Sequence, residues 1–117
     1  KDTDFTGKLV DIAPDGTAIN LTDGIIRARF RNGTDHEEFI SPNEPTEYTI
    51  DLWATSNLFK AGHRIGLEVT SSNFPRFDRN LNTGGALGQE TEMIPALQTI
   101  FHDAAHPSRL TLPIIPR

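Results

Sequence analysis

The chain has 117 residues, 36% of them hydrophobic, and a formal net charge of −5 at pH 7. This length fits one domain, and the acidic balance argues against nucleic acid as a partner, because binding to phosphates needs a basic surface. The sequence has no cysteine for a disulfide or thiolate site, no apolar run near the ~20 residues of a membrane span and no visible signal peptide. Because it opens on Lys1 rather than methionine, we expect a piece of a longer polypeptide.

The pattern predicts seven short strands separated by turns. Apolar and polar residues alternate most clearly in 25–31, 47–54 and 64–72. Turn chemistry is present at Pro14-Asp15-Gly16 and Thr22-Asp23-Gly24, where proline or aspartate precedes a glycine. In chain order the expected strands are residues 5–12, 18–21, 25–31, 47–54, 64–72, 98–102 and 110–115.

The same pattern indicates the fold class. No long segment has apolar residues at the helical period of 3.6, whereas short strands with frequent turns are typical of antiparallel sandwiches. We therefore expect residues 1–117 to form a single all-β sandwich domain.

Arg27, Arg29 and Arg31 share the polar face of one predicted strand. Like charges at every second position repel each other unless something opposes them. Two interpretations stay open, pairing with acidic residues of neighbouring strands or docking of a partner. The acidic residues on polar strand faces are Glu47, Asp51 and Glu68.

Trp53 falls on the polar side of its predicted strand, opposite the inward-facing Tyr48. An outward tryptophan often marks an interface. The loop at 73–88 could equally cover it, so a role in contacting a partner requires that the chain's own loops leave Trp53 exposed.

Motifs that resemble chemical sites each lack an essential part. His102 and His106 have the spacing of a zinc-protease motif, but Pro107 places them in a turn rather than a helix. Residues 2–7 resemble the start of a calcium loop, yet Ala13 stands where the bidentate glutamate should be. No serine has the G-x-S-x-G setting of a nucleophile elbow. We expect no catalytic residue, no metal site and no cofactor in this chain.

The most informative stretch runs from Ser71 to Gly84. It is a strand end followed by a long aromatic and charged loop, which Phe74 and Phe77 can anchor to the sandwich. Loops of this length in a compact domain usually have a function. The residues expected at an interface are Trp53, Phe74, Arg76, Phe77, Asp78, Arg79 and Asn80.

Sequence blocks in order along nearly the whole chain carry a family resemblance. They are Asp2–Phe5, Lys8–Asp11, Asp23–Arg31, Leu52–Val69, Ser71–Gly84, His106–Leu110 and Leu112–Ile114. On these blocks the chain resembles the C-terminal, non-catalytic domain of the X-prolyl dipeptidyl aminopeptidase / cocaine esterase family of α/β-hydrolases.

The resemblance implies a jelly-roll sandwich of the galactose-binding-domain-like kind. It also implies that a serine–aspartate–histidine triad lies in a preceding α/β-hydrolase domain, which this domain packs against and whose substrate pocket it helps to shape. No catalytic residue of the family maps onto this chain. The parent enzyme would act on esters, amides or X-Pro peptides.

The family's sandwich normally has at least one strand before the block that starts near Asp2. We therefore expect an unpaired sheet edge, which favours self-association, including strand exchange. Two other functions stay open, a carbohydrate-binding module and a purely structural oligomerisation module. Sugar binding usually needs several aromatic platforms, and the chain has one tryptophan and one tyrosine.

Overall fold

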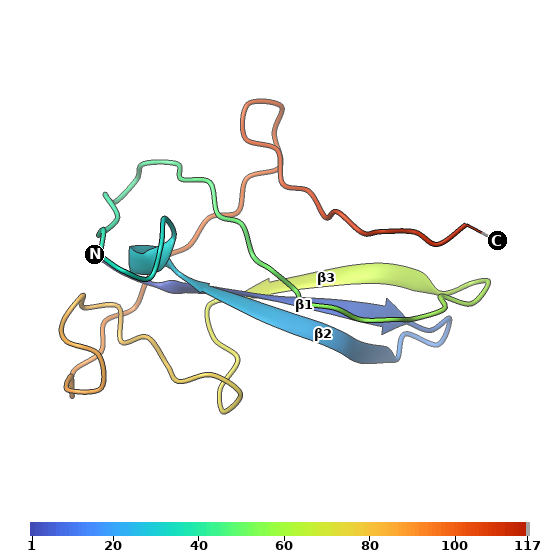
Figure 1. The fold of residues 1–117 in the computed structure, drawn as a ribbon, viewed down its shortest axis with the longest axis horizontal. Helices are drawn as coiled ribbons and strands as arrows, with labels where there is room; N and C mark the ends of the chain where they lie inside the picture. Colours follow the sequence, from blue (N-terminus) through green and yellow to red (C-terminus); the bar gives the residue numbers. More distant parts are fainter. Residues whose placement is uncertain (117) are drawn as a thin grey trace.

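The computed structural model describes residues 1–116, and its regular structure is almost entirely β. β1 (Asp4–Ile12), β2 (Ala18–Arg27) and β3 (Arg64–Thr70) form one antiparallel sheet in the order β2-β1-β3, with the short 3₁₀ helix η1 (Ala28–Phe30) after β2 (Figure 1). The expected all-β class is confirmed, whereas a jelly roll with a second sheet stays a prediction. No helix in residues 1–116 has the length and hydrophobicity needed to cross a membrane.

β1 and β2 form a hairpin around the first predicted turn. Gly16 has a φ of 90°, and Thr17 donates its N–H to Asp15 Oδ1 over 2.9 Å. Pairing then runs from Ile12↔Ala18 to Asp4↔Arg27, with one irregularity near the middle of β1. The turn sets the register near Ile12, and the irregularity between Leu9 and Val10 then shifts it by one residue, which places Asp4 opposite Arg27.

The turn expected at 22–24 is wrong, because β2 continues through it. Asp23 pairs with Lys8 and Gly24 with Gly7, so the ladder extends without a break. A Cβ at Gly24 would lie only 2.0 Å from the backbone oxygen of Asp51. The glycine therefore permits close approach of another segment rather than a change of chain direction.

The strand expected at 25–31 stops at Arg27, where η1 begins. Ala28 still donates its N–H to the carbonyl of Thr3 over 2.8 Å, but Arg29 turns into the interior toward Asp2. The polar face of this segment is therefore partly buried.

The segment expected as a strand at 47–54 covers one face of the sheet without joining it. Tyr48 packs on Phe5 with ring centroids 4.7 Å apart, and the side chain of Leu52 lies against Gly7. Tyr48 is half-buried, as predicted, but the segment has no strand ladder. It packs across the sheet mainly through side chains, so the predicted strand is wrong.

The expected strands at 98–102 and 110–115 are also absent from the described part of the chain. A strand needs a neighbour for its backbone groups, and no segment within residues 1–116 pairs with either of these. Gln98 instead donates its side-chain N–H to Thr3 Oγ1 and to the carbonyl of Asp4, at 2.5 and 3.1 Å.

The core of the described structure is small and largely polar. Its buried hydrophobic residues are Leu9, Val10 and Ala28, and its buried polar residues are Asp2, Thr3, Asp4, Thr6, Asp11 and Arg29.

The apolar residues of β3 are not part of that core. Ile65, Leu67 and Val69 were expected to face inward, but they are 53%, 42% and 38% exposed. The expectation is wrong because the segment that covers the sheet packs over β1 and β2, and nothing within residues 1–116 buries these side chains.

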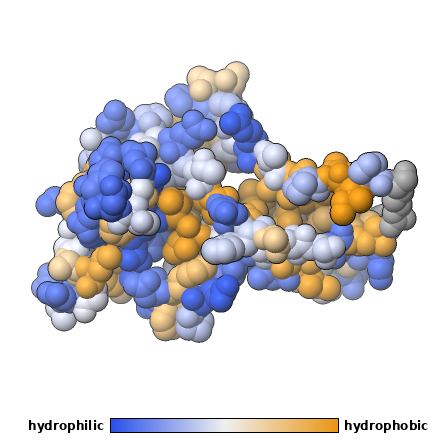
Figure 2. Space-filling view, viewed as in Figure 1, coloured by the Kyte–Doolittle hydropathy of each residue, from blue (hydrophilic) through white to orange (hydrophobic). Residues whose placement is uncertain are grey.

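The molecule is open for its size. Its exposed surface is 8808 Å², against about 6,300 Å² expected for a folded monomer of this mass. Its radius of gyration is 16.2 Å, against about 13 Å for a compact domain of this length. Figure 2 shows apolar residues on the surface over the half of the molecule that holds the strands.

Candidate functional site: an interface loop

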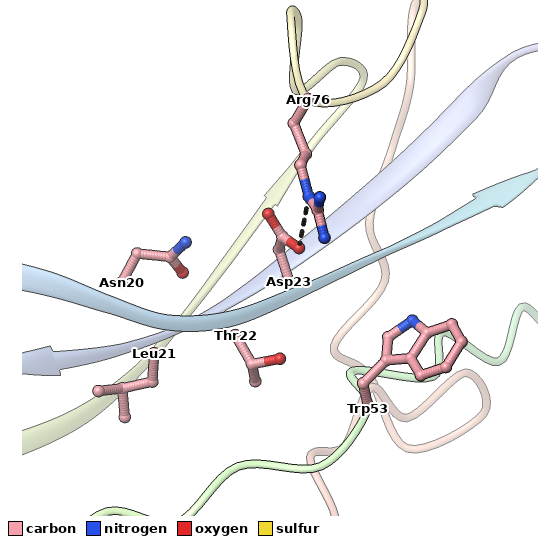
Figure 3. A pocket seen from close by; sticks show the side chains of 6 residues that line it. All are labelled: Asn20, Leu21, Thr22, Asp23, Trp53 and Arg76. Atoms are coloured by element: carbon pink, nitrogen blue, oxygen red, sulfur yellow. Dashed lines mark ion pairs between the residues drawn. The ribbon is translucent and has the colours of Figure 1, made fainter.

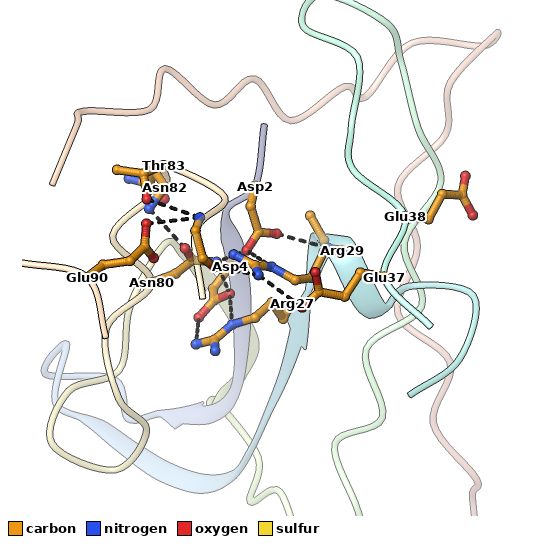
Figure 4. A network of polar contacts seen from close by, with 12 residues as sticks. Asp2, Asp4, Arg27, Arg29, Glu37, Glu38, Asn80, Asn82, Thr83 and Glu90 are labelled. Carbon is orange, nitrogen blue, oxygen red and sulfur yellow. Dashed lines mark hydrogen bonds and ion pairs between the residues drawn. The ribbon is translucent and has the colours of Figure 1, made fainter. Parts of the chain in front are cut away.

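The loop at 73–88, called here the interface loop, is held by a buried network of charges at one end of the sheet (Figure 4). Arg29 is 1% exposed, and its Nε lies 2.6 Å from Asp2 Oδ2. The backbone N–H of Arg29 donates to the other oxygen of Asp2 over 2.9 Å, and the guanidinium also donates to Glu37 and to the carbonyl of Gly85. Arg29 therefore connects β1, η1 and the interface loop.

A second pair lies beside the first because of the hairpin register. Asp4 pairs with Arg27, and Arg27 donates to both oxygens of Asp4 over 2.9 Å each. Asp2 and Arg29 lie two residues beyond Asp4 and Arg27 at the same end of the hairpin, just outside the two strands, and Asn80 donates to both aspartates. Bidentate contacts of this kind are the strongest arginine–carboxylate geometry.

Both arginines stay charged in this network. The hydrogen bond that Arg27 donates to Asp4 raises the pKa of Arg27 above its ordinary value. Burial acts to lower the pKa of Arg29, but the hydrogen bonds that it donates to Asp2 and Glu37 outweigh this effect, so the pKa of Arg29 is raised too.

Asn80 attaches the interface loop to this network. Its Nδ2 donates to Asp2 Oδ2 over 2.7 Å and to Asp4 Oδ1 over 2.8 Å. Its Oδ1 accepts the backbone N–H of Asn82 over 2.9 Å. Asn80 thus bridges two carboxylates and fixes the turn that follows it.

Asp23, on β2, holds the other end of the interface loop. It accepts a hydrogen bond from Asn73 Nδ2 over 3.0 Å and lies 3.5 Å from Nε of Arg76. Between these anchors, the guanidinium of Arg79 lies 4.6 Å from the ring centroid of Phe74.

The expected interface residues fall into two groups. Phe77 and Asn80 are half-buried, whereas the others are exposed. Phe74 is 59% exposed, so the expectation that it anchors the loop is wrong, and it lies against Arg79 instead. The exposed group is Trp53, Phe74, Arg76, Asp78 and Arg79.

Trp53 and Arg76 flank an open hollow of about 450 Å³ at the outer edge of β2 (Figure 3). Trp53 is 81% exposed, so the interface loop does not cover it. Its φ is 62°, and its N–H donates to Asp51 Oδ1 over 2.7 Å. The residues around the hollow are Asn20, Leu21, Thr22, Asp23, Trp53 and Arg76.

The charges of the arginine face are opposed, but not by the residues first considered. Arg27, Arg29 and Arg31 pair with acidic side chains, so the structural interpretation of this face is confirmed. The expectation of Glu47, Asp51 or Glu68 as partners is wrong, because these lie on segments that do not face the arginines. The partners are Asp2, Asp4, Glu37, Glu38 and Asp78.

Asp2 and Asp4 are the site residues that sequence reasoning missed. The turn at 14–16 indicated the hairpin, but its register alone would set Asp4 opposite Ile26. The irregularity between Leu9 and Val10, which no local pattern predicts, places Asp4 opposite Arg27.

Three histidines lie against aspartates: His36, whose Nδ1 is 3.0 Å from Asp35 Oδ1, His63 and His106. His63 Nδ1 lies 2.8 Å from Asp11 Oδ1, and within residues 1–116 no hydroxyl hydrogen-bonds to the His63 ring. His106 lies 3.2 Å from Asp103, whose pKa is lowered by the backbone N–H of His106. The His102–His106 segment is a bend, although the strands expected beside it are absent. Within the described residues no hydroxyl hydrogen-bonds to any of these three rings, so none of the contacts presents a nucleophile.

Comparison with known proteins agrees with this non-catalytic arrangement. Residues 1–111 match the family described as the X-Pro dipeptidyl-peptidase C-terminal non-catalytic domain. The chain is also 52% identical over 118 residues to a cocaine esterase from Rhodococcus sp. (strain MB1 Bresler), an alignment that covers 99% of this chain and 21% of that protein. The chain thus spans about a fifth of this relative's length. It belongs to the family of X-Pro dipeptidyl-peptidase C-terminal non-catalytic domains.

Proposed function

We propose that this chain packs on the α/β-hydrolase catalytic domain of its own polypeptide and helps to shape the substrate pocket there. The parent is then a serine hydrolase acting on esters or on X-Pro peptides. Membership of the family and the name of the esterase relative support this assignment. Residues 1–117 form one β-sandwich domain of that hydrolase.

The observation that carries the proposal is the amount of exposed surface. The chain exposes about 2,500 Å² more than expected for a folded monomer of its mass. Obligate interfaces bury about 2,000–5,000 Å² over both partners. The excess exposed surface of this chain is therefore large enough to form its side of an obligate interface.

Much of this surface is apolar and lies on segments without backbone partners. Leu97 is fully exposed, and Ile114 and Ile115 are 86% and 87% exposed. Apolar patches this extensive are rare on monomers and mark contacts. We propose that the parent polypeptide pairs with residues 98–102 and 110–115, turns them into strands, and completes a jelly roll of the galactose-binding-domain-like kind.

The interface loop is suited to a place beside a pocket. It presents Phe74, Arg76, Asp78 and Arg79 outward while Asn80 and Asp23 hold its ends. A polar group fixed in this way keeps its position when a neighbouring domain contacts it. The loop is therefore our candidate for the part that reaches the catalytic domain.

Leu97→Asp in the full polypeptide tests the docking of the domain. If Leu97 is buried against the parent, the charged substitution should cost about 3 kcal/mol or more, through lost apolar burial and an unpaired charge. Thermal unfolding and limited proteolysis of the full polypeptide measure the effect.

Ala104→Asp is the matched control, since Ala104 is also exposed but lies in the bend between the two proposed strands, where it adds the same charge without removing a large apolar side chain. We expect it to change stability by no more than about 0.5 kcal/mol. Equal stability of both variants and the unsubstituted polypeptide would contradict docking through this segment.

Self-association is the second candidate function. Among the described residues both outer edges of the sheet are free, and β3 exposes Ile65, Leu67 and Val69. An exposed apolar edge strand is a template for pairing with another chain. This observation favours a contact between copies through β3.

A further inference from the structure

We infer that the outer edge of β2 at residues 20–23, between Trp53 and Arg76, accepts an extended segment of the parent polypeptide as an added strand. The segment places an apolar side chain on Trp53 and a carboxylate on Arg76. The inference rests on the proposed function, because it takes the occupant from the rest of the hydrolase.

The backbone of β2 is available at this edge. β2 pairs with β1 on one side, and within residues 1–116 no backbone group pairs with its other side along 20–23. In an antiparallel strand every second residue turns its N–H and C=O away from the neighbour already paired. These groups can bind an extended peptide by main-chain hydrogen bonds.

Trp53 supplies an apolar surface at the edge. It is 81% exposed in a left-handed backbone conformation with a φ of 62°, which a bulky residue rarely adopts. The hydrogen bond from its N–H to Asp51 Oδ1 holds this conformation. Strained backbone that presents a side chain outward is typical of binding sites.

Arg76 supplies a cation with unused donors. Its side chain is 67% exposed, and its contact with Asp23 is a single approach of 3.5 Å through Nε. Asp23 already accepts a hydrogen bond from Asn73. The guanidinium can donate two parallel N–H groups to a carboxylate, which is its preferred partner.

The placement of the two side chains fits a strand. Figure 3 shows Arg76 on one side of the β2 ribbon and Trp53 on the other. Successive residues of a strand point to opposite faces, so neighbouring residues of one added strand can reach both. The occupant should therefore contain an apolar residue next to an aspartate or glutamate.

Two observations assign the occupant to the parent polypeptide: the length of the esterase relative that lies outside this chain, and the area of the excess exposed surface. This chain corresponds to about a fifth of its esterase relative, so most of such a hydrolase lies outside it. The excess exposed surface of about 2,500 Å² also needs a large partner rather than a short free peptide. A segment on the same polypeptide gains further from a high effective concentration.

Hydrogen exchange of the full polypeptide tests the inference. We expect the backbone amides of residues 19–25 to be protected on both sides of β2. Arg76→Glu should raise their exchange at least tenfold, because it sets a carboxylate against the carboxylate of the occupant. Arg109→Glu is the control, since Arg109 is also exposed and lies 3.9 Å from Glu47, away from β2.

Three results would overturn the inference. The backbone amides of residues 19–25 could exchange in the full polypeptide as fast as those of an unpaired edge strand. Their protection could depend on protein concentration, which would make the occupant a second copy. Trp53 fluorescence could instead respond to a panel of simple sugars, which would make the hollow a carbohydrate site.

The proposed function fails separately. If Leu97→Asp leaves the stability of the full polypeptide unchanged, docking itself is wrong. If Leu97→Asp destabilises it while residues 19–25 stay unprotected, only the assignment of the β2 edge is wrong.

Discussion

At the scale of single residues, paired charges replace part of the apolar core. Arg29 and Asp2 are both buried, and removing one member of such a pair leaves an uncompensated charge in the interior. Asn80 links this pair to that of Arg27 and Asp4. Single substitutions in this network should therefore have larger effects than most polar substitutions.

Asp2→Ala should destabilise the domain by about 3–5 kcal/mol, because Arg29 would remain buried with its closest carboxylate removed. Glu47→Ala is the control, since Glu47 and Arg109 are exposed and 3.9 Å apart, and such pairs contribute little. Denaturant unfolding of the full polypeptide measures both. Similar values for the two variants would show that the network contributes nothing special.

Asn80→Asp should destabilise more than Asn80→Ala, because it adds a third carboxylate where two already converge. The alanine variant should cost about 1–3 kcal/mol by leaving two acceptors without their shared donor. The difference between the variants should shrink near pH 4, where aspartates ordinarily begin to protonate. Unfolding at pH 7 and pH 4 measures it, and a difference independent of pH would contradict the electrostatic explanation.

At the scale of elements, the crossing of the 47–54 segment over the hairpin determines several details. The backbone oxygen of Asp51 lies against Gly24, and the hydroxyl of Thr22 donates to the carbonyl of Leu52. These contacts explain why Gly24 lies within a strand rather than in a turn. They also position Trp53, the next residue, at the edge of β2.

Gly24→Ala should destabilise by about 3 kcal/mol, since its Cβ would lie 2.0 Å from a backbone atom that can move only with its whole segment. Gly7→Ala, on the paired position of β1, should cost less, because its nearest contact is the movable side chain of Leu52 at 3.2 Å. Thermal unfolding of the two variants compares them. A smaller effect at Gly24 than at Gly7 would contradict the close crossing.

The elements differ in how far local sequence could predict them. β1, the turn at 14–16 and most of β3 were predicted because alternation and turn chemistry act over a few residues. The end of β2 and the path of 47–54 were not predicted. Arg29 is buried because it pairs with Asp2, and Gly24 lies within a strand because Asp51, which is distant in sequence, packs against it. The segments at 98–102 and 110–115 have the sequence pattern of strands, but no strand within the described residues pairs with their backbone groups.

At the scale of the whole molecule, the open shape is the dominant property. The chain buries few apolar side chains, while both outer edges of its sheet lack a strand among the described residues. A domain with this surface is expected to be stabilised by contact with other polypeptide.

Chain 1–117 produced alone should self-associate at high concentration through β3. Leu67→Lys combined with Val69→Lys should shift it toward monomer, because charges on an edge strand oppose pairing. Ser71→Lys with Ser72→Lys is the matched control just beyond the strand. Sedimentation measures the mass. If the unsubstituted chain 1–117 stays strictly monomeric at high concentration, self-association is contradicted.

The sequence by itself determined the all-β class, the first hairpin and the absence of a nucleophile elbow, since these depend on neighbouring residues and on composition. It also predicted a functional loop at 73–88. Only the tertiary structure decided which acids oppose the arginines, how Asn80 fixes that loop, and that Trp53 is exposed and lines one hollow with Arg76. These features join residues that are as many as 78 positions apart, and such contacts depend on strand register and on the packing of segments that no local pattern records.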